Sequence, residues 1–91
     1  MNARVIIQNA RILNIVEKSN DNPNNPITWY EVVFMKDSDV NTVTIDKKLS
    51  KLAIDDTYDL ELQITEVIKA SKEGNPYKQH KFKVVEAYEI D

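Results

Sequence analysis

The chain has no cysteine, and its 91 residues include one glycine, one histidine, one tryptophan and three prolines. Without cysteine it forms no disulfide, offers no thiolate to a metal ion and has no thiol nucleophile. Disulfides belong mainly to oxidising compartments, so the cytoplasm is the simplest expected location. So little glycine and proline excludes collagen-like and flexible low-complexity chains.

Long apolar runs are also missing. The apolar run nearest the N-terminus, Val5–Ile7, falls far short of the roughly 18–20 residues that span a membrane. The residues around it lack the long hydrophobic region and the cleavage site of a secretion signal. We therefore expect a soluble protein with no membrane partner.

Length and composition fit one compact domain covering residues 1–91. The hydrophobic fraction, 42%, is ordinary for a folded protein and too high for a disordered one. The 12 lysines and arginines stand against 15 aspartates and glutamates, which gives a net charge of -3. Taken over the whole chain, this balance disfavours a protein that binds nucleic acid or anionic membranes with its entire surface. The net charge does not exclude a local patch of positive charge.

Apolar and polar residues alternate with a period of two in two segments. Tyr58–Thr65 alternates throughout, and because successive side chains of a strand point to opposite faces, it predicts a strand with one buried face. Lys81–Ile90 predicts a second strand of this kind. Its predicted core face comprises Phe82, Val84, Tyr88 and Ile90. Glu86 falls on that face too, which we expect only near a twist or a sheet edge.

Three further strands are expected upstream. Thr28–Met35 is dense in aromatic and β-branched residues, and Val40–Asp46 is a shorter segment of similar character. Val5–Val16 reads as one long strand in which the apolar positions change from odd to even near Gln8–Asn9. Such a phase change predicts a β-bulge or a sharp bend.

One segment departs from the period of two. Lys47–Ile54 places Leu49 and Leu52 three residues apart, which predicts a helical turn or two. Asp46 stands where its carboxylate would cap the first turn.

Two polar segments rich in turn-forming residues, Lys18–Ile27 and Lys69–Gln79, predict the loops between strands one and two and between strands four and five. The resulting order is three strands, a short helix and two strands, which matches an OB-fold. We therefore predict an all-β, five-stranded, OB-like Greek-key barrel with one short helix. Another small barrel or sandwich, such as an SH3-like one, is the alternative. In an OB-fold the second and third strands and these two loops contact oligonucleotides.

Basic and acidic residues are segregated along the chain. The last predicted loop and strand carry Lys69, Lys72, Lys78, Lys81 and Lys83. These five lysines against Glu73 leave a local charge of +4. We predict that they follow the phosphates of a nucleic acid, with Lys36 and Arg11 as outlying contributors. The alternative is that the lysines keep an exposed hairpin soluble and prevent edge pairing.

Aromatic residues supply the flat faces on which bases stack when a protein binds single strands without sequence preference. Trp29 shares its predicted face with Glu31, and Tyr77 lies in the last polar segment, so both are candidate stacking residues. The alternatives are that Trp29 closes a barrel end and that Tyr77 packs within its own loop. Predicted core positions take the other aromatic residues, namely Tyr30, Phe34, Tyr58, Phe82 and Tyr88.

The strand order, the polar first loop, Trp29–Tyr30 at the start of strand two and the Gly74–Tyr77 hairpin resemble small single-stranded DNA-binding proteins. Bacteriophages, the filamentous type among them, and conjugative or mobile elements carry such proteins. The resemblance implies an OB-fold that binds single-stranded DNA without sequence preference, often as a dimer, in phage or mobile-element DNA replication or recombination. This chain departs from the group in having only Arg4 and Arg11 as arginines.

Residues suited to catalysis are few. His80 is the sole histidine, and neither a Ser-His-Asp set nor a phosphate-binding glycine loop nor a metal-ligand spacing is present. We therefore predict a protein that is not an enzyme and needs no cofactor or metal. Its expected partners are single-stranded DNA, with RNA as an open alternative, a second copy of the chain, and replication or recombination proteins. The rival hypothesis is a protein–protein adaptor that uses an acidic face and an exposed strand edge. The acidic strand around Asp59 and Glu61 and the acidic C-terminal residues Glu86, Glu89 and Asp91 favour it.

Overall fold

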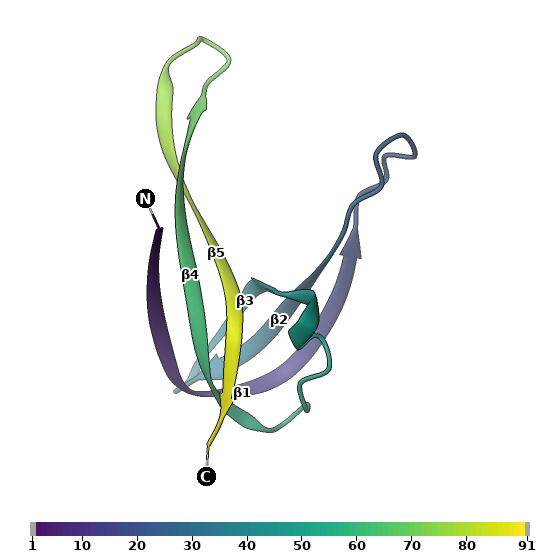
Figure 1. Ribbon diagram of the computed structural model, residues 1–91, viewed down its shortest axis with the longest axis vertical. Helices are drawn as coiled ribbons and strands as arrows, with labels where there is room; N and C mark the ends of the chain where they lie inside the picture. The colour runs from purple at the N-terminus through teal and green to yellow at the C-terminus, as the bar shows by residue number, and fades with distance from the viewer. Residues whose placement is uncertain (1, 91) are drawn as a thin grey trace.

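The computed structural model describes residues 2–90, which form five strands and one short 3-10 helix (Figure 1). The elements are β1 (Asn2–Ser19), β2 (Thr28–Lys36), β3 (Asp39–Ile45), η1 (Lys47–Leu49), β4 (Thr57–Ala70) and β5 (Pro76–Glu89). The strands close into a barrel in the order β1-β2-β3-β5-β4, with β3 and β5 parallel and the other neighbours antiparallel. This confirms the predicted all-β, OB-like, five-stranded barrel.

The core of the barrel draws residues from every strand, because each strand turns alternate side chains inward. Val32 and Phe34 of β2 are buried as predicted, and Tyr30 packs against them at the edge of the core. The remaining buried side chains are Ala10, Ile12, Ile45, Tyr58, Leu60, Leu62 and Val84. Burial of each large aliphatic or aromatic side chain contributes about 1.5–3 kcal/mol, so this small set carries much of the fold's stability.

β1 bends sharply in its middle, where the sequence predicts a phase change. Asn9 has a φ of 58°, a left-handed conformation that asparagine tolerates better than most residues. The register between β1 and β4 shifts between Ile7 and Ala10, and the Asn9 N–H donates to Oδ1 of Asp59 at 3.0 Å. The bend lets one strand pair with β4 along its first part and with β2 along its second, which closes the barrel.

β5 contains one extra residue, Val85, opposite the step from Glu61 to Leu62 in β4. This bulge reverses the alternation that the sequence suggests for the end of the strand. Ala87 therefore packs against the core, whereas Tyr88 is 48% exposed. The prediction that Tyr88 lies in the core was wrong for this reason.

The bulge also accounts for Glu86, which pairs with Glu61 and shares its outward side. Ile90, which follows β5, is exposed as well, contrary to the prediction. Phe82 is 47% exposed although its neighbour in β4, Ile64, contacts the core, because Phe82 lies where β5 leaves the barrel. The core assignment of Phe82 was therefore wrong too.

Two arms project from the barrel and diverge from each other (Figure 1). One is the continuation of β4 and β5, whose pairing extends to Ala70 opposite Pro76. The loop predicted for Lys69–Gln79 is thus wrong in its bounds, since the turn occupies residues 71–75 alone. Gly74, with a φ of 82°, donates its N–H to the Ser71 carbonyl within this turn.

The second arm is the end of β1, the start of β2 and the loop between them, residues 20–27. Asn20 holds this loop closed, because its side chain accepts from the Ile27 N–H at 2.9 Å and donates to the Asn25 carbonyl at 3.0 Å. Between β3 and β4, the helical segment is confined to η1, shorter than predicted. Asp46 caps it as expected, accepting the Lys48 N–H at 3.1 Å. Among residues 2–90, no helix has the length and apolar character that crossing a membrane requires.

Candidate nucleic-acid interface

The arm of β4 and β5 has two sides with different chemistry. Residues directly opposite in an antiparallel pair share a side, and alternate residues of a strand share a side. Lys69 opposite Tyr77 and Thr65 opposite Lys81 therefore lie on one side, together with Lys83. We call this side of the arm, with Lys69, Tyr77, Lys81 and Lys83, the basic face.

The basic face leads into two hollows on the barrel. The first, of about 520 Å³, is lined by Thr44, Thr65, Val67, Lys81, Phe82 and Lys83. The second, of about 440 Å³, is lined by Glu17, Thr28, Trp29, Tyr30, Thr44, Ile45, Asp46, Lys47 and Lys83. Thr44 and Lys83 line both, so the hollows are neighbours. We call the basic face and these two hollows together the basic groove.

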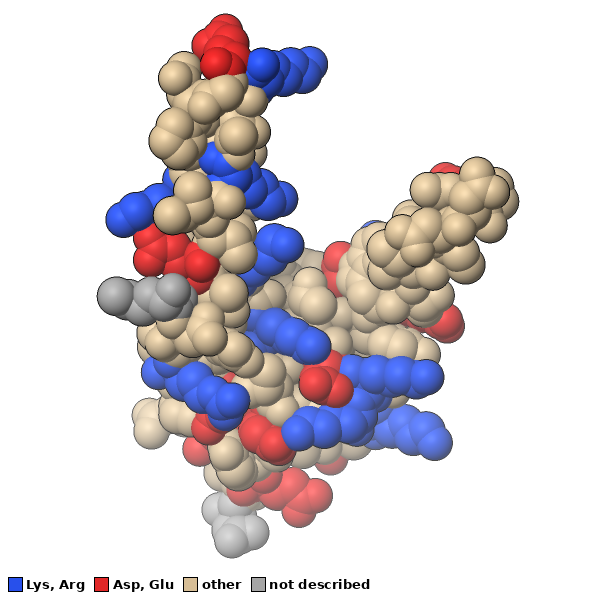
Figure 2. Space-filling view, turned by 45° about the horizontal axis from the view of Figure 1, so that its top comes forward, with Lys and Arg blue, Asp and Glu red and all other residues tan. Residues whose placement is uncertain are grey.

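Charged side chains are unevenly spread over the face of the molecule that Figure 2 shows. Lysines and arginines occur along the β4–β5 arm and across the barrel below it, with acidic residues between them. The outer part of the other arm is almost free of basic residues, since the only charged residue in its loop is Asp21. A phosphate backbone would therefore meet positive charge on one arm and on the barrel, and little on the second arm.

Several lysines of the basic groove are free to meet an anion. Lys47, Lys69 and Lys81 form no ion pair with any residue in the range 2–90. Lys83 lies 3.7 Å from Asp46, measured from Nζ to Oδ2, and its side chain is half exposed. An exposed pair at that distance is weak, so Lys83 is readily diverted to a phosphate.

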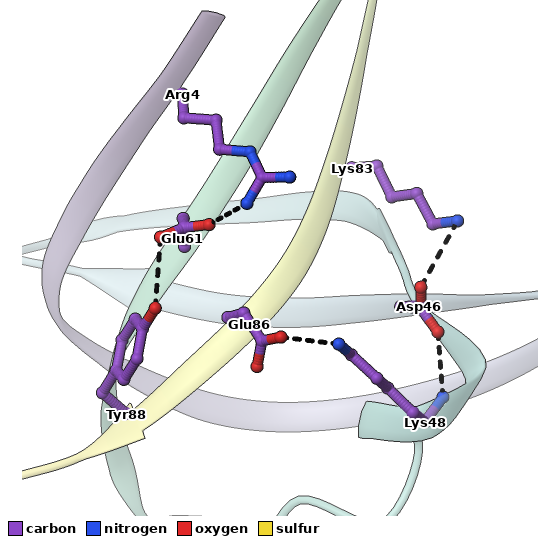
Figure 3. A network of polar contacts seen from close by, with 7 residues as sticks. All are labelled: Arg4, Asp46, Lys48, Glu61, Lys83, Glu86 and Tyr88. Atoms are coloured by element: carbon purple, nitrogen blue, oxygen red, sulfur yellow. Dashed lines mark hydrogen bonds and ion pairs between the residues drawn. The ribbon is translucent and has the colours of Figure 1, made fainter.

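Figure 3 shows polar contacts that include Asp46 and Lys83, two residues that line the groove. Lys48 donates to Oε1 of Glu86 at 2.6 Å, and this hydrogen bond raises the pKa of Lys48 above its ordinary value. Asp46 links the network to the groove, because one of its oxygens caps η1 and the other faces Lys83. Lys48 is thus engaged with its carboxylate partner, in contrast to the adjacent Lys47.

In a second set of contacts in Figure 3, Glu61 accepts hydrogen bonds from Arg4 and from the Tyr88 hydroxyl. The hydrogen bond to Glu61 raises the pKa of Tyr88. These two hydrogen bonds therefore tie β1, β4 and β5 together on the outside of the barrel. The Tyr88 hydroxyl thus has a hydrogen-bond partner on the outer surface, at a position that the bulge removes from the core.

The two candidate stacking residues occupy different parts of the groove. Trp29 is half-buried, and its Nε1–H donates to Oε2 of Glu31 at 3.0 Å, which fixes one edge of the ring. It is not among the residues that pack on the core within residues 2–90, which disfavours its role as a barrel-end plug. Tyr77 is 48% exposed and lies on β5 opposite Lys69, not within a loop.

Four of the predicted site residues lie elsewhere. Lys78 is on the side of the arm opposite the basic face, 3.2 Å from Oε1 of Glu66. Lys72 lies in the turn at the tip of the arm. Arg11 is engaged with Asp55 near the bend of β1.

The fourth, Lys36, donates to the Gln8 carbonyl at 2.6 Å and lines a separate cavity. Of the predicted residues, the structure places Lys69, Tyr77, Lys81 and Lys83 on one side of the arm, and Trp29 in a hollow that Lys83 also lines. Sequence reasoning did not include Thr44 or Lys47, although Lys47 belongs to a basic cluster visible in the sequence. Both lie in the groove because the end of β3 pairs with β5. This pairing is a long-range contact that no local sequence pattern predicts.

Within residues 2–90, no group of three or more histidine, cysteine or acidic side chains is arranged to hold a metal ion. His80 lies with Glu66 on the side of the arm away from the basic face. Comparison of the chain with protein-family models, with curated proteins and with solved structures gives no match.

Proposed function

We propose that this protein is a non-catalytic single-stranded DNA-binding protein that holds its ligand along the basic groove without strong sequence preference. Trp29 and Tyr77 stack on bases, and Lys47, Lys69, Lys81 and Lys83 contact phosphates. The observation that carries the proposal is the continuity of the groove, in which Trp29 and Lys83 line one hollow and Lys81 and Lys83 line the next.

The arrangement suits a flexible, extended ligand better than a rigid one. From Tyr77 to Lys83 the strand advances by about 20 Å, at about 3.3 Å per residue. Over that length the basic face offers charge and one aromatic ring, and a second aromatic ring follows across Thr44 at Trp29. Alternating positive charge and stacking faces are what sequence-independent binding of single strands requires.

The number of free lysines sets the strength of the salt dependence. Each phosphate neutralised on a single strand contributes about 0.7 to the slope of log affinity against log salt concentration. Four lysines therefore give a slope of about -3. Binding should be measurable at low salt and weak at high salt.

The biological setting follows from the resemblance noted in the sequence, and it is part of the proposal. It supports a role in phage or mobile-element DNA replication or recombination in the cytoplasm, with replication or recombination proteins as further partners. A homodimer fits the same setting. RNA is the competing ligand, and the groove holds no feature that selects the deoxyribose.

The test is a titration of the full chain with oligo-dT at low salt, followed through the fluorescence of Trp29, the sole tryptophan. We expect quenching that saturates, and a decrease in affinity with the slope given above as salt rises. An oligo-U competitor of equal length decides between DNA and RNA. Absence of quenching together with absence of a gel shift at low salt contradicts the proposal.

The rival adaptor hypothesis requires free acidic groups on β4, and two of these groups already have partners within the chain. Its acidic strand offers Asp59 and Glu61, but Asp59 accepts the Asn9 N–H and Glu61 is held by Arg4 and Tyr88. These carboxylates are engaged within the chain. A partner that requires free acidic groups on β4 would have to displace them.

A further inference from the structure

β3 and β5 close the barrel over a very short distance. They pair only at Thr44 with Lys83 and at Ile45 with Val84. Before this point β5 belongs to the projecting arm, whereas β3 continues beside β2 alone (Figure 1). Residues 39–43 of β3 therefore have one free edge among the described residues.

The free edge exposes backbone groups that are ready to pair. The Asp46 N–H donates to the Val84 carbonyl at 2.9 Å, which shows that the backbone at this position points toward β5. Backbone groups alternate in direction along a strand, so those of Thr42 and Val40 point to the same side. There they meet no strand within residues 2–90. An unpaired edge of this kind is a template for an added strand.

On the inner side, the gap opens into an apolar cavity of about 620 Å³ at the mouth of the barrel. Its lining comprises Ile6, Ile7, Gln8, Phe34, Lys36, Asn41, Val43, Leu62 and Phe82. Phe82 and Ile6 are each about half exposed, so apolar surface is left open to water here. Side chains that point inward from an added strand would enter this cavity.

On the outer side, the same gap borders the hollow that contains Lys81 and Lys83. Phe82 lines both this hollow and the apolar cavity, so the two are adjacent, and strand alternation turns Lys81 and Lys83 to the opposite side of β5 from Phe82. Thr44 and Thr65 complete the outer wall with neutral polar groups. The inner side therefore accepts apolar side chains, and the outer side accepts acidic ones.

We propose that an extended segment of a partner protein, in which apolar and acidic residues alternate, adds to the free edge of β3. Its backbone pairs with Val40 and Thr42, its apolar side chains fill the cavity, and its acidic side chains face Lys81 and Lys83. This is β-augmentation, in which main-chain hydrogen bonds supply affinity and alternating pockets supply specificity.

Peptide fits this edge better than nucleic acid does. The edge presents carbonyl acceptors as well as N–H donors, and a phosphate backbone has no donor for the carbonyls. This proposal also differs from the DNA-binding one in the residues it needs, since Thr42 and the lining of the apolar cavity other than Phe82 lie outside the basic groove. Lys81, Phe82 and Lys83 are common to both.

The test uses a capped peptide of about eight residues that alternates valine and glutamate, with a matched peptide that alternates valine and lysine. Binding to the full chain is followed by the NMR shifts of backbone amides. We expect the glutamate peptide to shift the amides of Val40, Thr42 and Phe82, and the lysine peptide to bind about tenfold more weakly or not at all.

Thr42→Pro is the decisive variant. Proline removes the N–H that points to the free edge, and an edge strand accepts it there without losing a bond to β2. We expect loss of peptide binding with oligo-dT binding unchanged. Phe82→Ala, at a half-exposed position, should weaken the peptide as well, which provides a second reading should Thr42→Pro fail to fold.

Three results would overturn the proposal. One is equal binding of the two peptides, which would mean that the lysines play no part. Another is unchanged binding to both variants, or shifts confined to the arm beyond Lys81, which would mean that the strand edge is not used. The third is no binding of the glutamate peptide in the millimolar range.

Discussion

Asp46 and Lys83 face each other across the join between β3 and β5, with Oδ2 and Nζ 3.7 Å apart. The other oxygen of Asp46 caps η1. The carboxylate is therefore an internal competitor for the one lysine that lines both hollows of the basic groove. A phosphate that binds Lys83 has to displace it.

Asp46→Asn should therefore strengthen DNA binding. Asparagine caps a helix about as well as aspartate, so the fold is retained while the competing charge is removed. An exposed pair contributes roughly 0.2–1 kcal/mol, which predicts an increase in oligo-dT affinity of about 1.4-fold to fivefold. The measurement is a fluorescence titration at low salt. Glu86→Gln is the matched control, because it frees Lys48 outside the groove, and an equal gain there would show that only net charge matters.

Asn9 carries the bend of β1, and its left-handed backbone makes a second prediction. Asn9→Val should lower the free energy of unfolding by about 1–2 kcal/mol, because a β-branched residue is strained at positive φ. Asn9→Gly should stay close to the wild type, since glycine adopts this conformation freely. Urea denaturation measures both. If valine proves as stable as glycine, the bend does not depend on the backbone conformation of this residue.

The Glu66–Lys78 pair lies on the side of the arm opposite the basic face, and it predicts that the stability of the fold depends on pH. The hydrogen bond from Lys78, together with its charge, lowers the pKa of Glu66. A lowered carboxyl pKa stabilises the fold above the unfolded-state value of about 4.3, and this contribution is lost as the pH falls through the lower folded-state value. NMR titration of the Glu66 carboxyl should show the shift, and Lys78→Gln should raise the pKa of Glu66. An identical titration in the variant would contradict the contact.

Hydrophobic alternation was sufficient to predict the strands, their order and the central part of the core, as Val32 and Phe34 show. It failed at Tyr88, because a single bulged residue shifts every following position to the opposite face and leaves no mark in composition. The bend at Asn9 was predictable, since there the apolar positions themselves change phase.

The sequence predicts the kinds of residue in the candidate site, lysines and exposed aromatic residues, but only some of the particular residues. Lys78 and Lys81 were grouped because both were assigned to one basic hairpin, with the first in its loop. Because β4 and β5 stay paired as far as Ala70 and Pro76, side chains alternate between the two sides of the arm along its whole length, and Lys78 and Lys81 point to opposite sides. The closeness of Trp29 to Lys83 depends on the parallel pairing of β3 with β5, a long-range contact that no local signal in the sequence specifies.

The most direct test of the account compares Lys81→Glu with Lys78→Glu in oligo-dT titrations at low salt. The two substitutions change net charge equally and lie three residues apart on the same strand. Binding along the basic groove predicts that Lys81→Glu weakens affinity about tenfold and lowers the salt slope by about 0.7, while Lys78→Glu has only the smaller effect of net charge. Equal losses in the two variants, or a larger loss in Lys78→Glu, would contradict the account.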